Sequence, residues 1–210
     1  MDETVQKLTA LGAQVERCKL PTFDYALSAY YIISSAEATS NLSRYDGVKY
    51  GFRAQDYTDI KDLYYKTRAQ GFGEEVKRRV MLGNYVLSSG YYDAYYLKAL
   101  KVRTLIKRDF DRLFDQYDLI LSPVTAGQAF HLGENSDPLQ MYLTDIYTVP
   151  VNIAGLPAIS IPGKLTADGM PIGVQLIAKP FGECTMFQAA YALEQEFHFD
   201  AKPSLREGDK

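Results

Sequence analysis

The pattern of apolar residues is clearest between residues 73 and 114, where it predicts two consecutive helices. The first begins at Gly73, with Glu74 and Glu75 in its first turn, where carboxylates face the positive end of the helix dipole. It ends before Gly90. The second helix carries apolar residues at spacings of three and four, which marks a face that must be buried. These residues are Tyr95, Ala99, Val102, Ile106, Phe110 and Leu113.

The other side of the second helix carries charged side chains. Lys107 and Asp111 have the spacing at which opposite charges pair along a helix. A solvent-exposed helix face would account for the whole set. Its members are Lys98, Lys101, Lys107, Arg108, Asp109, Asp111 and Arg112.

A run of cations interrupts the apolar pattern of the first helix. Lys77, Arg78 and Arg79 lie between Val76 and Val80, so at least one of them must turn toward the apolar side. Such a side chain either covers the core with its aliphatic stem while its charge reaches water, or binds an anionic partner. Both interpretations stay open from the pattern alone.

Tyrosines dominate the start of the second helix. Tyr91, Tyr92, Tyr95 and Tyr96 are separated by about one turn in pairs. They form either a stacking platform for nucleic-acid bases or half-buried packing, and tyrosines at this spacing more often pack.

Helical spacing also predicts helices over residues 3–11, 24–42 and 59–70. Gly12 fits the position just past the end of the first, and Asp24 can cap the start of the second. Small residues give the second helix a narrow surface that permits close contact with another helix.

Two further segments complete the first part of the chain. Residues 15–20 favour extended structure and end before a proline, which predicts a strand, whereas residues 43–58 lack periodicity and form a loop. On the helix over residues 24–42, Tyr30 is either a core residue or a pocket wall that offers its hydroxyl.

The last part of the chain contains the predicted strands, over residues 118–122, 158–161 and 172–178. Asp168-Gly169 marks a turn between the last two strands, which should pair antiparallel. Residues 123–142 are irregular. Asp145 then stands as a lone acid beside an apolar segment, where it should need a partner.

A final helix is predicted over residues 183–197, with Phe187, Tyr191 and either Leu193 or Glu194 packed against the core, followed by a polar tail over residues 201–210. The fold class is therefore α/β with a helix-rich first half, as a single domain over residues 1–200. Its strands are few for so many helices. The sheet is thus either small or completed by chain outside this sequence.

Composition excludes several functional classes. The 210 residues are 47% hydrophobic and carry a net charge of −3, so no basic field attracts nucleic acid. The only cysteines are Cys18 and Cys184 and the only histidines are His131 and His198, which argues against a metal site or a disulfide framework. We expect a cytoplasmic protein, because neither a membrane span nor a signal-peptide core is visible.

Motifs for catalysis are missing. The sequence contains no GxSxG, no P-loop and no GxGxxG, so it offers no activated serine and no phosphate cradle. Ser88-Ser89-Gly90 is best interpreted as a helix end.

Four segments, however, resemble the C-terminal part of the amidase-signature family. They are Ser34–Gly51 with its RYDG loop, Gly71–Gly83 with GFGEEVKRR, Ser88–Tyr96 with SGYYDAYY, and Val149–Pro162 with GLPAISIP. Within that family they resemble the branch formed by the glutaminase subunits of glutamyl-tRNA(Gln) amidotransferases. The resemblance implies the C-terminal portion of a mixed β-sheet covered by helices. The family's catalytic lysine and two serines belong to an N-terminal region that has no counterpart here.

The resemblance also implies a glutamine-binding role for Tyr30, Arg79 and Asp145. Free glutamine is a zwitterion, so a pocket that selects it needs a cation for the α-carboxylate and an anion for the α-ammonium. Arg79 and Asp145 are the two charges that the helix patterns left without an explanation. The alternative roles are a helix salt bridge for Arg79 and a capping or turn acid for Asp145.

Three functions follow as hypotheses. The chain is the glutamine-binding part of a glutaminase subunit, which supplies ammonia for converting Glu-tRNA(Gln) to Gln-tRNA(Gln), or a non-catalytic module that holds partner subunits, or part of a general amidase. The resemblance implies that this chain binds no cofactor and that ATP and Mg are used by a partner subunit. Its partners would be the N-terminal amidase half and the other subunits, with Glu-tRNA(Gln) contacted only indirectly. The chain alone should be inactive.

Overall fold

The computed structural model describes residues 1–133 and 138–202. These residues form two compact units, one comprising Met1–Phe23 with the chain from Ile106 onward, and the other comprising Asp24–Leu105. We call them the sheet unit and the helical unit and describe each by itself.

The sheet unit is built on three strands, β1 (Leu119–Pro123), β2 (Ala158–Leu165) and β3 (Pro171–Ala178), in the order β1-β3-β2. Both pairs are antiparallel, with Ile120 opposite Ile177 and Ile159 opposite Leu176. The central strand β3 is buried from Val174 to Ala178, because a neighbouring strand covers each of its edges.

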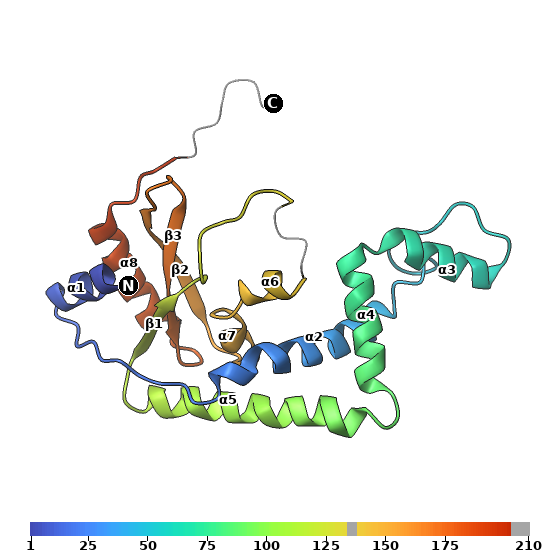
Figure 1. The fold of residues 1–210 in the computed structure, drawn as a ribbon, viewed down its shortest axis with the longest axis horizontal. Helices are drawn as coiled ribbons and strands as arrows, with labels where there is room; N and C mark the ends of the chain where they lie inside the picture. Colours follow the sequence, from blue (N-terminus) through green and yellow to red (C-terminus); the bar gives the residue numbers. More distant parts are fainter. Residues whose placement is uncertain (134–137, 203–210) are drawn as a thin grey trace. The chain divides into compact units, whose positions relative to one another are not determined.

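One face of the sheet is covered by α8 (Glu183–Phe197), and α1 (Asp2–Ala10) lies beside α8 (Figure 1). Side chains at alternate positions of the strands meet one stripe of α8, as the periods of strand and helix require. The resulting core consists of Ile161, Val174, Leu176, Ala178, Met186, Ala190 and Leu193.

Two short helices, α6 (Pro138–Leu143) and α7 (Val149–Ala154), precede β2. Gly155 ends α7 in the left-handed conformation, at φ 73°, which glycine adopts without strain. The sheet unit also contains the C-terminal part of α5 (Lys98–Phe114), where Ile106 and Phe110 are buried.

The helical unit contains α2 (Ala26–Leu42), α3 (Ile60–Gly71), α4 (Glu74–Leu87), the π-helical turn Tyr92–Leu97 and the start of α5. Helices α2 and α4 are in close contact at Gly83, where an added Cβ would lie 2.1 Å from the Ser35 carbonyl oxygen and the Thr39 Oγ1. The small-residue surface predicted for α2 therefore does permit a close helix contact.

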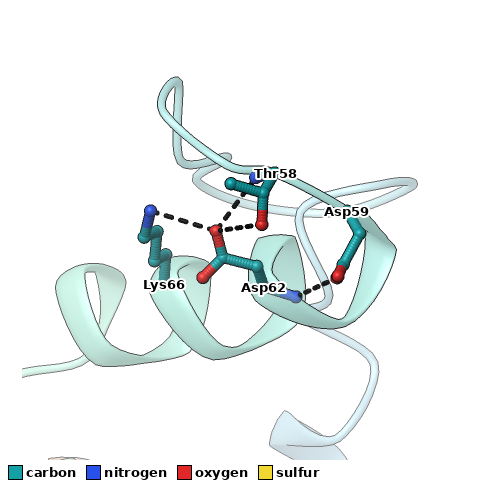
Figure 2. A network of polar contacts seen from close by, with 4 residues as sticks. All are labelled: Thr58, Asp59, Asp62 and Lys66. Carbon is teal, nitrogen blue, oxygen red and sulfur yellow. Dashed lines mark hydrogen bonds and ion pairs between the residues drawn. The ribbon is translucent and has the colours of Figure 1, made fainter.

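The start of α3 is fixed by a local network (Figure 2). Asp59 is the N-cap, and its Oδ1 accepts from the Asp62 backbone N–H at 2.8 Å. The Asp62 Oδ2 accepts from the Thr58 backbone N–H at 3.0 Å and pairs with Lys66 Nζ at 3.0 Å. The backbone bond from Thr58, with help from Lys66, lowers the pKa of Asp62 below its usual value.

The α/β class and all the predicted helices are confirmed, with α8 at the predicted bounds. The strands of the described residues pair only antiparallel, so any parallel pair of the mixed sheet that the resemblance implies lies outside them. The single domain over residues 1–200 stays a prediction beside the two compact units. Of the tail over residues 201–210, residues 203–210 lie outside the described part.

The strand predicted over residues 15–20 is wrong. Residues 13–20 belong to no helix or strand, and the chain is exposed from Leu11 to Lys19. Residues of high β propensity form a strand only where a neighbouring strand supplies hydrogen bonds, and no strand of the three-stranded sheet pairs with residues 15–20.

Two predictions about helix ends and loops are also wrong. A 3₁₀ turn over Phe23–Tyr25 precedes α2, so that Tyr25 occupies the N-cap and Asp24 does not cap the helix with its side chain. The irregular region predicted over residues 123–142 contains the start of α6, and its residues 134–137 lie outside the described part.

The buried face of α8 differs from the prediction. Phe187 and Tyr191 are 55% and 65% exposed, whereas Met186, Ala190 and Leu193 are buried. Neighbouring positions on a helix are separated by about 100°, so a shift of one residue exchanges the faces. The smaller side chains fit closely against the sheet.

Asp109 does not belong to an exposed charged face. Its side chain is only 5% exposed, and its Oδ2 accepts from the Thr22 hydroxyl at 2.6 Å and from the Thr22 backbone N–H at 3.0 Å. The neighbouring pair Lys107–Asp111 is exposed and bonded at 2.9 Å, as predicted.

Candidate substrate-binding site

The structure places the three predicted binding residues on different elements. Tyr30 lies on α2 and Arg79 on α4, both in the helical unit, and the Tyr30 hydroxyl is among the groups that raise the pKa of Arg79. Asp145 belongs to the sheet unit, in the turn before α7.

Arg79 is the one of the three clustered cations whose side chain is most buried. Its side chain is 29% exposed, against 38% for Lys77 and 51% for Arg78. Its Nε donates to the Glu75 Oε1 at 2.8 Å, and its guanidinium carbon lies 5.2 Å from the centre of the Tyr31 ring. The prediction that a cation turns toward the apolar side is therefore confirmed.

The surroundings of Arg79 favour its charged form. Burial opposes the charge, but the hydrogen bond and the negative charge of Glu75 outweigh it and raise the pKa of Arg79. Glu75 accepts its hydrogen bond from the Arg79 Nε, so this bond leaves the N–H groups of the two terminal nitrogens for other acceptors. Such a guanidinium can hold a carboxylate through its terminal nitrogens while Glu75 fixes its direction.

Glu75 also pairs with Arg78, one turn away on the exposed side of α4. The helix salt bridge that was the alternative role for Arg79 is thus present. It does not exclude anion binding, since Arg78 and Arg79 together bring two positive charges to one carboxylate.

Asp145 begins the turn that leads into α7. Its backbone carbonyl accepts from the backbone N–H groups of Val149, at 2.9 Å, and Thr148, at 3.1 Å, and from the Thr148 hydroxyl at 3.2 Å. The side chain is half-buried. The main chain of Asp145 is therefore fixed by the first turn of α7, while the role of its carboxylate stays a prediction.

A buried amide that the sequence analysis missed joins this turn to the sheet. Gln175, in the middle of β3, is 4% exposed. Its Nε2 donates to the Ser122 Oγ at 2.8 Å, the Pro123 carbonyl at 3.2 Å and the Tyr147 carbonyl at 2.9 Å. The available signal was a glutamine within an apolar strand, which must find buried partners.

The tyrosines form a cluster on the helical unit. The rings of Tyr85, Tyr91 and Tyr95 have centroids 4.3–6.0 Å apart, and each residue is 40–45% exposed. A hydrogen bond with Tyr91 raises the pKa of Tyr85 to about 12. The three rings therefore pack against one another on an exposed surface, so the half-buried position predicted for Tyr91 and Tyr95 is wrong, while a role in stacking bases stays a prediction.

Within residues 1–133 and 138–202, no group of three or more His, Cys, Asp or Glu side chains is placed to hold a metal ion. Both cysteine thiols are free. No helix among the described residues is both long enough and apolar enough to cross a membrane.

Two surface hollows lie elsewhere. One, of about 280 Å³, is lined by residues between Leu42 and Phe72 of the helical unit. The other, of about 570 Å³, lies in the sheet unit between the first residues of α1 and the turn after β1. Neither is lined by Tyr30, Arg79 or Asp145.

Comparison with known proteins decides the family, because the profile of the amidase family matches residues 1–187. The chain belongs to the amidase family. The resemblance inferred from the four sequence segments is thereby confirmed.

Among the family's curated members, the glutamyl-tRNA(Gln) amidotransferase A-subunit of Desulforamulus reducens is 58% identical over 196 residues, which cover 93% of this chain and 40% of that protein. Its counterpart from Halothermothrix orenii is 56% identical over 198 residues, covering 94% and 42%. This amidase chain thus spans about 40% of the length of the curated relatives that it matches.

Solved structures also match the fold of this chain. The crystal structure of the glutamyl-tRNA(Gln) amidotransferase A-subunit from Thermotoga maritima matches with a TM-score of 0.70 at 40% identity, over 95% of this chain and 38% of that one. A 6-aminohexanoate cyclic dimer hydrolase matches with a TM-score of 0.67 at 19% identity, over 97% and 42%. The second likeness shows the fold alone.

Proposed function

We propose that this chain is the glutamine-binding part of the glutaminase subunit, the A-subunit, of a glutamyl-tRNA(Gln) amidotransferase. The observation that carries the proposal is the 56–58% identity to such subunits over almost the whole chain. In the complete enzyme, the subunit would release ammonia from glutamine for the conversion of Glu-tRNA(Gln) to Gln-tRNA(Gln). ATP and Mg would be used by a partner subunit.

In this proposal, each binding residue recognises one part of the substrate. The terminal nitrogens of Arg79 hold the α-carboxylate in a bidentate pair, Asp145 accepts from the α-ammonium, and Tyr30 adds its hydroxyl to the pocket. The Glu75 bond supports this role, because it restricts the guanidinium before the substrate arrives.

The chain itself supplies no nucleophile in this mechanism. Attack on the side-chain amide of glutamine needs an activated hydroxyl and donors for the developing oxyanion, and the sequence contains no motif for either. The catalytic groups would come from the part of the subunit that this chain does not span. We therefore expect no ammonia release from glutamine by the chain alone.

The test is the affinity of the full-length subunit for glutamine, measured by calorimetry for Arg79→Ala and for the matched control Arg78→Ala. Arg79→Ala should weaken binding by roughly 2–5 kcal/mol, because the substrate carboxylate would lose the partly buried cation that pairs with it. Arg78→Ala removes an equal charge beside the same Glu75 and should change the affinity little. An equal loss in both variants would show a general electrostatic effect and contradict the proposal.

The half-exposed tyrosine cluster favours a second candidate, a non-catalytic module that contacts a partner subunit. The same calorimetric titration with glutamine distinguishes the glutamine-binding role from the interaction module. A full-length subunit whose glutamine affinity is independent of Arg79 would favour the interaction module.

A further inference from the structure

We propose that Gln175 is a positioning residue for substrate recognition, since it ties the turn that carries Asp145 to the end of the sheet. The inference rests on the proposed function, because it concerns how Asp145 is held for the α-ammonium of glutamine. Gln175 does not itself contact the substrate in this proposal.

The position of Gln175 leaves its amide little freedom. Gln175 lies opposite Ser122 on one side and Ser160 on the other, so hydrogen-bonded strands fix its backbone from both edges. A buried side chain on such a strand cannot shift along the sheet without breaking the ladder.

The amide nitrogen is surrounded by acceptors. It has two hydrogens, and three oxygen atoms lie within hydrogen-bond distance, those of the Ser122 hydroxyl and the Pro123 and Tyr147 carbonyls. Two of these acceptors belong to β1 and its end, and the third belongs to the turn before α7. The amide therefore acts as a clamp between two segments that are distant in sequence.

The clamped carbonyl is close to Asp145 along the chain. Asp145 is bonded through its carbonyl to the backbone of Thr148 and Val149, so residues 145–149 form one hydrogen-bonded turn. Tyr147 lies inside that turn. Because the turn is internally closed, fixing its Tyr147 carbonyl also fixes the backbone from which the Asp145 side chain extends.

Loss of the clamp should therefore act on glutamine recognition. The Tyr147 carbonyl is partly buried, so without its donor it would pair with another group, and the turn that carries it would move. A misplacement of a positioned group by about 1 Å can lower the reaction rate on the order of a hundredfold. Ammonia, which lacks an α-ammonium and an α-carboxylate, does not need this group.

The experiment uses the full-length subunit in its complex, with Gln175→Met, which keeps the length and volume of the side chain without the donor. The expected result is a rise of about ten- to a hundredfold in KM for glutamine, with a much smaller change in the rate supported by ammonia. The control Gln116→Met makes the same exchange at an exposed position of the same unit and should leave both rates unchanged.

Gln175→Glu keeps the protein testable if the methionine variant does not fold. Burial among three oxygens should keep the new carboxyl protonated, so that it retains one O–H donor. The KM for glutamine should then lie between those of the wild type and Gln175→Met.

The double variant with Asp145→Ala separates this inference from the proposed function. If Gln175 acts through Asp145, the effects on KM are not additive, and Gln175→Met adds little once Asp145 is removed. Additive effects, or an equal loss with both nitrogen donors, would overturn the positioning role. If Asp145→Ala alone leaves KM for glutamine unchanged, the proposed function fails instead.

Discussion

The contacts of the Asp109 carboxylate lower its pKa and so make part of the protein's stability depend on pH. Burial disfavours its charge, but the two hydrogen bonds from Thr22 and the pair with Arg112 outweigh this and lower the pKa of Asp109 below its ordinary value of 3.8. A lowered pKa in the folded state means that the contribution to stability is present above the unfolded-state pKa. It is lost as the pH falls through the folded-state value.

Asp109→Asn should therefore lower the free energy of unfolding by about 1 kcal/mol at pH 7, because hydrogen bonds to a charged acceptor are replaced by weaker neutral ones. The difference from the wild type should shrink below a pH of about 4, because the carboxylate of the unfolded wild type then binds a proton that the folded state, with its lowered pKa, does not yet accept. Urea unfolding at pH 7 and pH 3 measures both values.

The control for this variant is Asp111→Asn, on the same helix, where the side chain is 49% exposed and pairs with Lys107. Exposed helix pairs contribute little, so the control should change stability by only a few tenths of a kcal/mol. A loss for Asp109→Asn that persists unchanged at pH 3 would assign its effect to packing.

At the residue scale, the sequence predicted the inward-turned cation of α4 better than it predicted the partners of Asp109 or Gln175. Three cations between valines on one helix are a local pattern, and helix periodicity requires at least one of them to turn inward, although it does not say which. The partners of Asp109 and Gln175 lie far away in sequence, at Thr22 and at Ser122 and Tyr147. Periodicity carries no information about such partners.

At the scale of elements, the contact between α2 and α4 depends on a glycine. An alanine at Gly83 would gain about 0.5–1 kcal/mol of helix propensity. Its Cβ would, however, lie 2.1 Å from backbone and side-chain oxygens of α2, which must move. Overpacking of this kind costs typically about 1–3 kcal/mol, so the clash outweighs the propensity.

Gly83→Ala should accordingly destabilise the helical unit, with faster hydrogen exchange in both α2 and α4. The comparison variant is Gly127→Ala, at a site where a Cβ meets nothing within 4 Å and where the backbone is not left-handed. It should leave exchange in these helices unchanged. Unaltered exchange in Gly83→Ala would mean that the two helices are not held by this contact.

The helices were predictable because capping residues and apolar spacing are local signals, as at Asp59 and Gly73. The prediction of a strand over residues 15–20 was wrong because strand formation depends on a partner edge, which no local pattern reveals. The prediction of the buried face of α8 was wrong for a related reason. Phe187 and Tyr191 are the larger side chains, but the sheet accepts the stripe of Met186 and Ala190.

At the scale of the whole molecule, the sheet unit exposes large apolar side chains. Phe181 is 97% exposed, Phe187 55% and Tyr191 65%, and all three belong to α8 or the residues before it. Exposed aromatic groups of this kind mark surfaces that pack against other protein. We propose that the rest of the subunit covers them in the complete protein.

The 210-residue chain by itself should therefore self-associate and bind a dye that fluoresces on apolar surfaces. The double variant Phe187→Ser/Tyr191→Ser should bind less dye and shift toward the monomer in light scattering, because neither side chain contributes to the buried core. A monodisperse wild-type monomer that binds no dye would contradict this expectation.

In the proposed function, Arg79 and Asp145 recognise the two charges of free glutamine. The most direct measurement compares glutamine and ammonia as nitrogen donors for Asp145→Ala in the full-length subunit within its complex. Removing the acid should lower kcat/KM for glutamine roughly thirtyfold or more, which corresponds to a loss of about 2–5 kcal/mol in transition-state binding. The rate with ammonia should stay near that of the wild type. Asp118→Ala, at an exposed acid of the same unit, should affect neither donor. An equal loss with both donors, or no loss with glutamine, would contradict the claim.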